Sequence, residues 1–327
     1  MFASGSYGWK NDHAVVPSVS PNLAGLARML GAVFCFATMA AFVKAGRAAG
    51  MSTTETMVYR MAPGLVWIAY EMRRTGAPLV PRRKGATRLR TAFGVLAMAG
   101  SFYAVSGLTL LQHTILHLLQ PIFVAVLSPL LLRERLRGAA VLALLLALTG
   151  ALGAVRIDRA LSEMADLSWR YGLVGLGAAV ASALAHITVR LATGRSLGSR
   201  RTGLLALAHG RPPDAPETVV FHFTLWGSVL AAAAGLLLGD FHGLAGGLTP
   251  RTTGLVAGMA GFGALGQVLM SRAYARAQAP LVALVAYAAI PISIGLDAVV
   301  WGTGLSLSGA TGTALMLVAG VLLVRAR

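Results

Sequence analysis

Three polar side chains recur along one apolar stretch at a spacing that matches one face of a helix. His113, His117 and Gln120 stand four and then three residues apart, so in a helix they project from the same side. In hydrocarbon such a face must turn toward protein or water, because an unpaired polar group there costs free energy. The stripe therefore predicts a surface that binds a polar solute. A polar clasp between two helices, without a solute, would give the same pattern.

The pair His113 and His117 also has the i, i+4 spacing that metal ligands use on a helix. Membrane-embedded metal enzymes, however, need several groups of histidines. The chain has 7 histidines, and of the others only His186 falls well inside an apolar stretch, while His222 lies near the end of one. We therefore predict no metal site and no cofactor. No Gly-x-x-x-x-Gly-Lys loop occurs in the sequence, so it predicts no nucleotide-driven motor in this chain.

Ionisable side chains inside apolar stretches are costly, about 2.5–3.5 kcal/mol at mid-bilayer even on mild insertion scales. Arg60 is the strongest candidate, either to bind an anionic group of a substrate or to form a structural ion pair. Asp297 would serve as a proton-coupling carboxylate or as the partner of Arg60. Glu55 and Lys44 lie nearer to stretch ends, where they reach interfacial water, and Glu55 is kept as a candidate coupling residue.

Two prolines, Pro121 and Pro291, fall inside apolar stretches. Proline removes a backbone hydrogen bond and can hinge a helix, so we predict a hinge at each. A static kink is the alternative.

The composition places these residues in a membrane protein. Of the 327 residues, 56 % are hydrophobic and 12 % are charged, and the mean hydropathy is +0.72, which is far from the composition of soluble domains. The formal net charge is +17, but the basic residues cluster in short gaps between apolar runs, as membrane topology demands. We therefore expect no nucleic-acid partner. Cys35, the single cysteine, is assigned to packing.

Apolar runs long enough to cross a bilayer as helices recur along the chain. The sequence predicts an all-α integral membrane protein with ten transmembrane helices, of which the second is the weakest because it carries Glu55, Arg60 and Glu71. The predicted spans are 24–45, 54–72, 91–111, 114–132, 138–156, 171–192, 217–239, 253–273, 280–301 and 308–324.

The distribution of Lys and Arg predicts the orientation of these spans. With ten spans, 21 of the 28 basic residues fall on the side of the two termini, six fall on the other, and Arg60 is the last. Both termini are therefore expected in the cytoplasm. Arg272 and Arg276, like Arg133 and Arg135, are interpreted as topology anchors.

A short internal match suggests a duplication. Phe102-Tyr103-Ala104 and Pro121 can be laid on Ala273-Tyr274-Ala275 and Pro291 with shifts of 171 and 170 residues. Each half would hold five spans, and because five is odd, the halves would have opposite orientations in the membrane. We expect a disordered cytoplasmic tail at 1–22, a first repeat at 23–157 and a second at 168–327. The second would hold a mobile cytoplasmic loop at 194–216, for which a lipid-headgroup contact is the alternative.

Several segments carry a resemblance to a known family. Ser101-Phe-Tyr-Ala-Val-Ser-Gly-Leu, Gln112 to Phe123 and Leu131-Leu-Arg-Glu-Arg-Leu resemble the proline-bearing fourth helix and the Gly-Glu-Arg-type turn of EamA-type transporters, in the drug/metabolite transporter superfamily. Gly266 to Ala283 resembles their second repeat, and Phe36 to Phe42 their first helix. The resemblance implies ten helices in two inverted five-helix repeats. Two departures are Thr303, where an acidic residue is usual, and the two histidines of the fourth helix, where small neutral residues are usual.

The resemblance also implies which helices line a central cavity. On those helices, the further candidate substrate-binding residues are Thr38, Tyr103, His186, Gln267 and Tyr287. Each of them alone is also explained by packing.

Together these features predict a secondary active transporter in the bacterial plasma (inner) membrane. It would move a small organic metabolite or drug by alternating access, with proton coupling as one option, and would be a monomer or homodimer whose partners are a small-molecule solute and membrane lipid. A metal-dependent membrane enzyme that uses the histidines and a passive channel are the alternatives. The histidines, Arg60 and the aromatic residues favour a polar solute, with aromatic and anionic solutes as options. The resemblance also allows amino acids, nucleobases, flavins, S-adenosylmethionine and cationic drugs.

Overall fold

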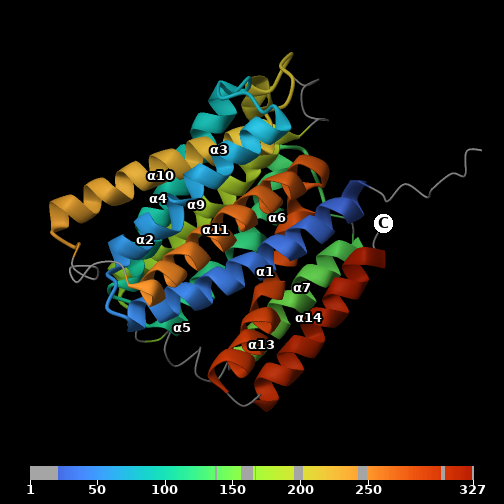
Figure 1. The fold of residues 1–327 in the computed structure, drawn as a ribbon. Helices are drawn as coiled ribbons and strands as arrows, with labels where there is room; N and C mark the ends of the chain where they lie inside the picture. The colour runs from blue at the N-terminus through green and yellow to red at the C-terminus, as the bar shows by residue number, and fades with distance from the viewer. Residues whose placement is uncertain are drawn as a thin grey trace, which may run out of the picture.

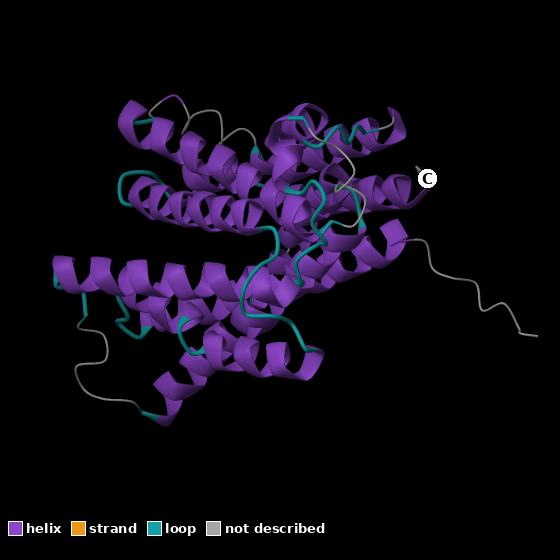
Figure 2. Ribbon diagram, turned by 90° about the horizontal axis from the view of Figure 1, so that it is seen from above, coloured by secondary structure: helices purple, strands orange, loops and turns teal. Residues whose placement is uncertain are grey.

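The computed structural model describes residues 21–136, 138–155, 165, 167–194, 202–241, 249–302 and 306–325. Across these residues the regular elements are all helical (Figure 2). Helix α1 begins at Pro21, slightly before the expected end of the N-terminal tail. The rest of that tail, Thr303 and part of the 194–216 loop lie outside the described residues.

Figure 1 shows the order and arrangement of the helices. They are α1 (Pro21–Ala48), α2 (Thr53–Met61), α3 (Gly64–Thr75), α4 (Lys84–Val105), α5 (Leu110–Leu118), α6 (Gln120–Leu131), α7 (Gly138–Ala154), α9 (Trp169–Thr193), η2 (Gly203–Leu207), α10 (Pro216–Leu238), α11 (Pro250–Arg276), α12 (Ala279–Leu284), η3 (Val285–Ala288), α13 (Ala289–Trp301) and α14 (Leu307–Arg325).

Each predicted span falls on a helix or on a run of short helices. Within the described residues, six helices are long and apolar enough to cross a membrane, and 138–154 and 307–323 form shorter apolar helices. The protein is therefore an all-helical, multi-pass membrane protein. The count of ten spans stays a prediction.

Three predicted spans are interrupted, and a proline stands at each interruption. Pro63 lies between α2 and α3, Pro121 in the first turn of α6, and Pro291 in the first turn of α13 after the 3₁₀ turn η3. Proline lacks the N–H that an uninterrupted helix would use. Pro121 and Pro291 thus lie where a hinge was predicted, although whether the chain bends there stays a prediction.

Three antiparallel helix pairs have the most extensive contacts: α1 with α11, α4 with α9, and α7 with α14. Small residues allow the close approach. A Cβ atom on Gly312 of α14 would collide with the carbonyl oxygen of Gly150 on α7, so these two helices touch through their backbones.

The largest buried core lies where α9 and α11 meet α1, α6 and α12, and it includes Ile187, Leu191, Tyr274 and Val282. The described part of the 194–216 loop also packs against the protein, because Leu205 is 2 % and Asp214 4 % exposed. Leu205 of η2 belongs to the largest core, as expected for an apolar side chain. The mobility of the linker at 194–216 stays a prediction.

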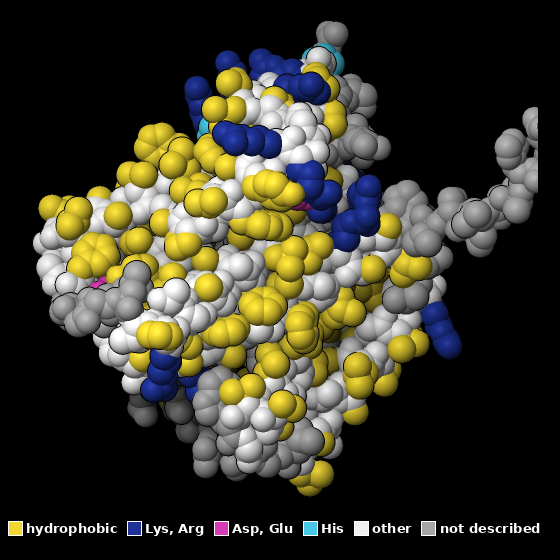
Figure 3. All heavy atoms as spheres, viewed as in Figure 1, with side chains coloured by type: hydrophobic (Ala, Val, Ile, Leu, Met, Phe, Trp, Pro, Cys, Tyr) yellow, Lys and Arg dark blue, Asp and Glu magenta, His cyan; other side chains and the backbone are white. Residues whose placement is uncertain are grey.

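Basic side chains are concentrated toward one end of the bundle. In Figure 3, dark blue side chains gather at the top and upper right, a smaller group lies at the lower left, and apolar and uncharged atoms cover most of the surface between them. Arg28, Arg82, Arg272 and Arg276 line one cleft at the end of the bundle where α1 begins and α11 ends. We call this end of the bundle the basic end.

Candidate functional site

A cavity of about 250 Å³ lies among α2, α4, α5, α9, α10 and α11. Its polar lining residues are Arg60, Arg90, Ser101, His117, Ser182, His186 and Gln267, and its apolar wall includes Phe102, Phe223 and Met270. Among the described lining residues there is no Asp or Glu. The cavity therefore offers hydrogen-bond donors, positive charge and aromatic surface, but no acidic group.

Arg90 is the most deeply buried charged group of this lining, with 4 % of its surface exposed. Its Nη2 donates a long hydrogen bond of 3.4 Å to Oε1 of Gln267, and its guanidinium carbon lies 4.1 Å from the centre of the Phe223 ring. Gly94, one turn further along α4, leaves space for the guanidinium, because a Cβ there would collide with Nη1 of Arg90. Contact with the ring stabilises the cation but does not neutralise it.

Sequence reasoning missed Arg90 because the span was expected to begin at residue 91, with Arg90 in the preceding basic loop. Helix α4 begins earlier, at Lys84. Arg90 therefore lies nearly two turns inside the helix.

Arg60 reaches the same cavity from the last turn of α2. Within the described residues its side chain has no hydrogen bond or ion pair. Asp297, proposed as its partner, instead forms an ion pair with Lys44 at 3.1 Å, and both side chains of this pair are about half exposed, at 44 % and 57 %. The predicted alternative of an Arg60–Asp297 pair is therefore wrong. Asp297 is paired with Lys44, whereas Arg60 lies at the cavity.

The predicted polar stripe divides into residues that line the cavity and residues that support them. His117 lines it, and its ring centre lies 5.3 Å from that of His113. Nε2 of His113 is 2.7 Å from Oγ of Ser101. Gln120 donates through Nε2 to Nδ1 of His186 at 2.6 Å, which leaves the proton of the neutral imidazole on Nε2.

His186 is also held from its other side. Its ring stacks on Tyr274 with centres 5.4 Å apart. The tyrosine is completely buried. This support fixes the imidazole at the wall of the cavity.

Four other candidates are not among the residues that line the cavity. Thr38 donates to the carbonyl of Phe34 in its own helix, and the exposed Tyr103 stacks on Tyr171 with centres 5.2 Å apart. The hydroxyl of Tyr287 donates to the carbonyl of Leu118 at 2.8 Å.

Glu55, the fourth, caps its own helix. It accepts a hydrogen bond from the N–H of Ser52 at 2.7 Å, in a capping box at the start of α2. These contacts are structural, and a role of the four residues in substrate binding or coupling gains no support from their positions.

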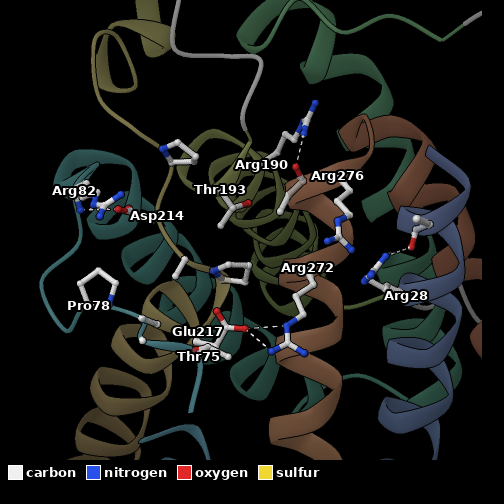
Figure 4. Close-up of a pocket in the computed structure, with 17 residues that line it drawn as sticks. Arg28, Thr75, Pro78, Arg82, Arg190, Thr193, Asp214, Glu217, Arg272 and Arg276 are labelled. Carbon is white, nitrogen blue, oxygen red and sulfur yellow. Dashed lines mark hydrogen bonds and ion pairs between the residues drawn. The ribbon is translucent and has the colours of Figure 1, made fainter. Parts of the chain in front are cut away.

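A wider cleft of about 930 Å³ opens at the basic end (Figure 4). Five arginines line it together with only two acidic residues among its described lining; these residues are Arg28, Arg82, Arg190, Arg272, Arg276, Asp214 and Glu217. Figure 4 shows Arg276 on α11 next to Arg28 on α1, whereas Arg272 on α11 is directed toward Glu217. The cleft is therefore electropositive.

The cleft and the cavity are stacked along two helices. On α9, His186 lines the cavity, and Arg190, one turn or about 5.4 Å further on, lines the cleft. On α11, Met270 lines the cavity and Arg272 the cleft. The base of the cleft is thus about one helical turn from the cavity.

Ion pairs with buried carboxylates lie at this level. Arg190 binds Glu134, whose other oxygen accepts the N–H of Ala279 at 2.8 Å. Arg272 binds both Glu71, at 2.7 Å, and Glu217, at 2.6 Å. Arg272 and Glu134, expected in or beside topology anchors, are therefore paired and central. No signal in the local sequence reveals these pairs, since the partners are distant along the chain.

Glu71 also binds Arg74, through two hydrogen bonds of 2.8 and 2.7 Å. These hydrogen bonds raise the pKa of Arg74 above its ordinary value. Glu71 thus binds two arginines, Arg74 and Arg272, at the same time.

Asp214 fixes the wall of the cleft. Its Oδ1 accepts the N–H of Arg83 at 3.0 Å and its Oδ2 the hydroxyl of Thr87 at 2.8 Å, at the start of α4. The Arg83 side chain donates to the carbonyls of Leu191 and Gly194, both at 2.8 Å. Burial lowers the pKa of this guanidinium from its ordinary value. These contacts join the loop before α4 to the end of α9.

A metal site has no support in the described part of the chain. Within it, no group of three or more His, Cys, Asp and Glu side chains could hold a metal ion. His113 and His117 therefore lack further protein ligands there.

Comparisons with known proteins give consistent results. The sequence model of the EamA-like transporter family matches residues 23–156. The pseudopaline exporter CntI of Pseudomonas aeruginosa is 28 % identical over 296 residues, which cover 90 % of this chain and 94 % of the exporter. An uncharacterized transporter of Helicobacter pylori is 28 % identical over 307 residues, covering 92 % of this chain and 94 % of that protein.

A solved crystal structure is similar in fold. It covers 94 % of this chain and 99 % of its own, with a TM-score of 0.69 and 18 % identity. At this identity the likeness shows the fold alone. The names of the sequence relatives and of the matched family indicate a transporter rather than an enzyme.

Proposed function

Because this chain belongs to the drug/metabolite transporter superfamily, through its EamA-like region, we propose that it is a secondary active transporter working by alternating access. It moves a small polar organic solute across the bacterial plasma membrane, with both termini in the cytoplasm. The cavity is the solute site, and the basic end with its cleft faces the cytoplasm, as the excess of Lys and Arg predicts.

One observation carries this proposal: polar groups from both predicted repeats converge on a single cavity. Arg60, Arg90 and His117 come from the first repeat, and His186 and Gln267 from the second. A site at the interface of two repeats is the arrangement that alternating access requires. It is accessible from one side or the other according to how the repeats sit together.

The helix contacts support the inverted repeat. With five spans in each half, α1 corresponds to α9 and α4 to α11, so the α1–α11 pair corresponds to the α9–α4 pair. These are two of the three most extensive contacts. The interruption at Pro121 likewise corresponds to the one at Pro291. The family match over 23–156 agrees with a first repeat at 23–157.

The ion pairs below the cleft form the gate on the basic side. Glu134 and Glu71 belong to the first repeat, whereas Arg190 and Arg272 belong to the second. Because each pair joins the two repeats, opening a path from the cleft to the cavity requires that they separate or shift together. The floor of the cleft is thus closed by charge pairs that the transport cycle must rearrange.

The relatives suggest a direction and a first solute to test. A protein named as a pseudopaline exporter aligns over most of this chain. We therefore propose export as the direction and pseudopaline as the first candidate solute.

The proposal is tested in vesicles that contain the purified protein. Vesicles loaded with a bacterial metabolite extract, or with pseudopaline, are diluted into buffer, and the solutes that leave are identified by mass spectrometry against protein-free vesicles. A carrier gives flux that saturates and is accelerated by the same solute on the other side. Flux that rises linearly with concentration would instead indicate a channel, and the absence of protein-dependent flux would contradict transport.

A further inference from the structure

The cavity holds two guanidinium groups and no acidic side chain among its described lining residues. Arg90 is 4 % exposed and contacts an amide oxygen and an aromatic ring. Arg60 has no hydrogen bond or ion pair in the described part of the chain. An unneutralised buried cation is unfavourable, because it loses hydration without gaining an opposite charge.

The acidic side chains of the described residues do not supply this charge, because each is engaged elsewhere. Four make ion pairs, one caps α2, one caps the start of α4 and one binds Thr54 at the start of α2. These seven residues are Glu71, Glu134, Glu217, Asp297, Glu55, Asp214 and Asp240.

We infer that the solute is an organic anion, and that its carboxylate or phosphate group binds Arg90, with Arg60 as the second cation. This inference rests on the proposed function and names the chemical class of the solute. A guanidinium offers several N–H donors in a plane that matches the oxygens of either acid. The negative charge of the solute would then neutralise the guanidinium groups in the cavity, which the described acidic side chains do not.

The other lining residues define the rest of the solute. Phe102, Phe223 and Met270 provide apolar contacts for an organic body. The neutral His186 presents its Nε2 proton, and Gln267 an amide, as hydrogen-bond partners. A volume of about 250 Å³ is near the lower end for ligand pockets, so we expect a small metabolite.

The cleft favours the same class of solute. Five arginines against two acids make its lining positive. Arg28 donates to the carbonyl of Ala24 in its own helix and has no ion pair within the described residues. Arg276, which lines the same cleft, is exposed. A positively charged cleft raises the local concentration of anions and steers them toward the cavity.

Two variants on α4 distinguish the effect of the arginine in the cavity from the effect of the protein's net charge. Arg90→Gln removes the buried cation, whereas Arg88→Gln removes an exposed arginine two residues away. The two proteins have the same net charge. Arg90→Lys keeps the cation without the planar donor array, and Arg60→Gln changes the second cation from another helix if Arg90→Gln does not fold.

The experiment uses vesicles loaded with anionic, neutral or cationic fractions of a bacterial metabolite extract. We expect protein-dependent flux from the anionic fraction. It should fall about 10- to 100-fold in Arg90→Gln, less in Arg90→Lys, and not in Arg88→Gln. Flux confined to neutral or cationic solutes would overturn the inference and leave the transport function intact.

A binding measurement keeps the two proposals distinguishable. The melting temperature of the detergent-solubilised protein is measured with each fraction, since a ligand that binds the folded state raises it. If no fraction is transported but the anionic one stabilises the wild type and not Arg90→Gln, the anion site stands and the transport function fails. If the anionic fraction is neither transported nor stabilising, the inference is overturned.

Discussion

Arg190 donates to a single carboxylate oxygen, Oε1 of Glu134, through both Nε and Nη2, at 2.9 and 2.8 Å. The same guanidinium donates through Nη1 to the carbonyl of Tyr274 at 3.0 Å. Glu134 follows α6, Arg190 is near the end of α9 and Tyr274 is near the end of α11. One buried pair thus joins three parts of the bundle directly beneath the cleft.

Glu134→Gln should destabilise the protein strongly, by about 3–5 kcal/mol, because it leaves the Arg190 cation buried without its counterion. The measurement is the melting temperature of the purified protein in detergent. Asp297→Asn is the matched control, since it removes one carboxylate charge from a half-exposed pair. Equal decreases in melting temperature for the two variants would show that the buried pair stabilises the protein no more than the half-exposed pair.

Asp297→Asn should itself cost less than about 1 kcal/mol, because an exposed ion pair with Lys44 is solvated and screened. Flux should keep its size and its dependence on pH. The assay compares flux at several pH values in vesicles containing wild type or variant. If the variant loses the pH dependence of the wild type, Asp297 is a proton-coupling residue, as the sequence allowed.

Arg133→Gly should raise the free energy of unfolding by about 1 kcal/mol. Arg133 has φ 57°, a left-handed conformation that costs about 1–2 kcal/mol for a residue with a Cβ, and glycine avoids that cost. Its hydrogen bond to Thr202 at 3.2 Å is exposed and offsets little of the gain. Arg135→Gly is the control, and the prediction fails if both glycine variants melt below the wild type.

Gly94→Ala should weaken solute affinity although alanine favours helices. Its Cβ would collide with Nη1 of Arg90 and lie 2.8 Å from Cε2 of Phe223, so the guanidinium must leave its position. The concentration for half-maximal flux reports the change. Gly177→Ala serves as control, because a Cβ there has no atom within 4 Å. Equal affinity in both variants would contradict the assigned position of Arg90.

Much of the fold was predictable, because hydrophobic stretches of this length report membrane helices directly. The stretches around 24–45 and 171–192, for example, coincide with α1 and α9. The first residues of the helices were less predictable, because basic residues at the membrane–water interface have the composition of a loop. The basic residues between Lys84 and Arg90 therefore predict a loop, whereas in the structure they form the first turns of α4 and bring Arg90 to the cavity.

The candidate site was predicted in part. Of the predicted stripe, His117 lines the cavity and Gln120 contacts His186, and His186, Gln267 and Arg60 also line the cavity. Their role in binding a solute stays a prediction. Tyr287 was selected by residue type, but its hydroxyl is directed to a backbone carbonyl. Which polar residues meet depends on contacts between helices far apart in sequence, and a single sequence does not contain that information.

The glycine contact between α7 and α14 has a consequence for how such a chain could arise. In the proposed repeat these helices are counterparts, so Gly150 against Gly312 is a contact of one surface with its own copy. Such self-complementary contacts are the isologous interfaces that join the subunits of symmetric dimers. On the proposed inverted repeat, the contact between α7 and α14 would be the seam at which two antiparallel five-helix copies meet.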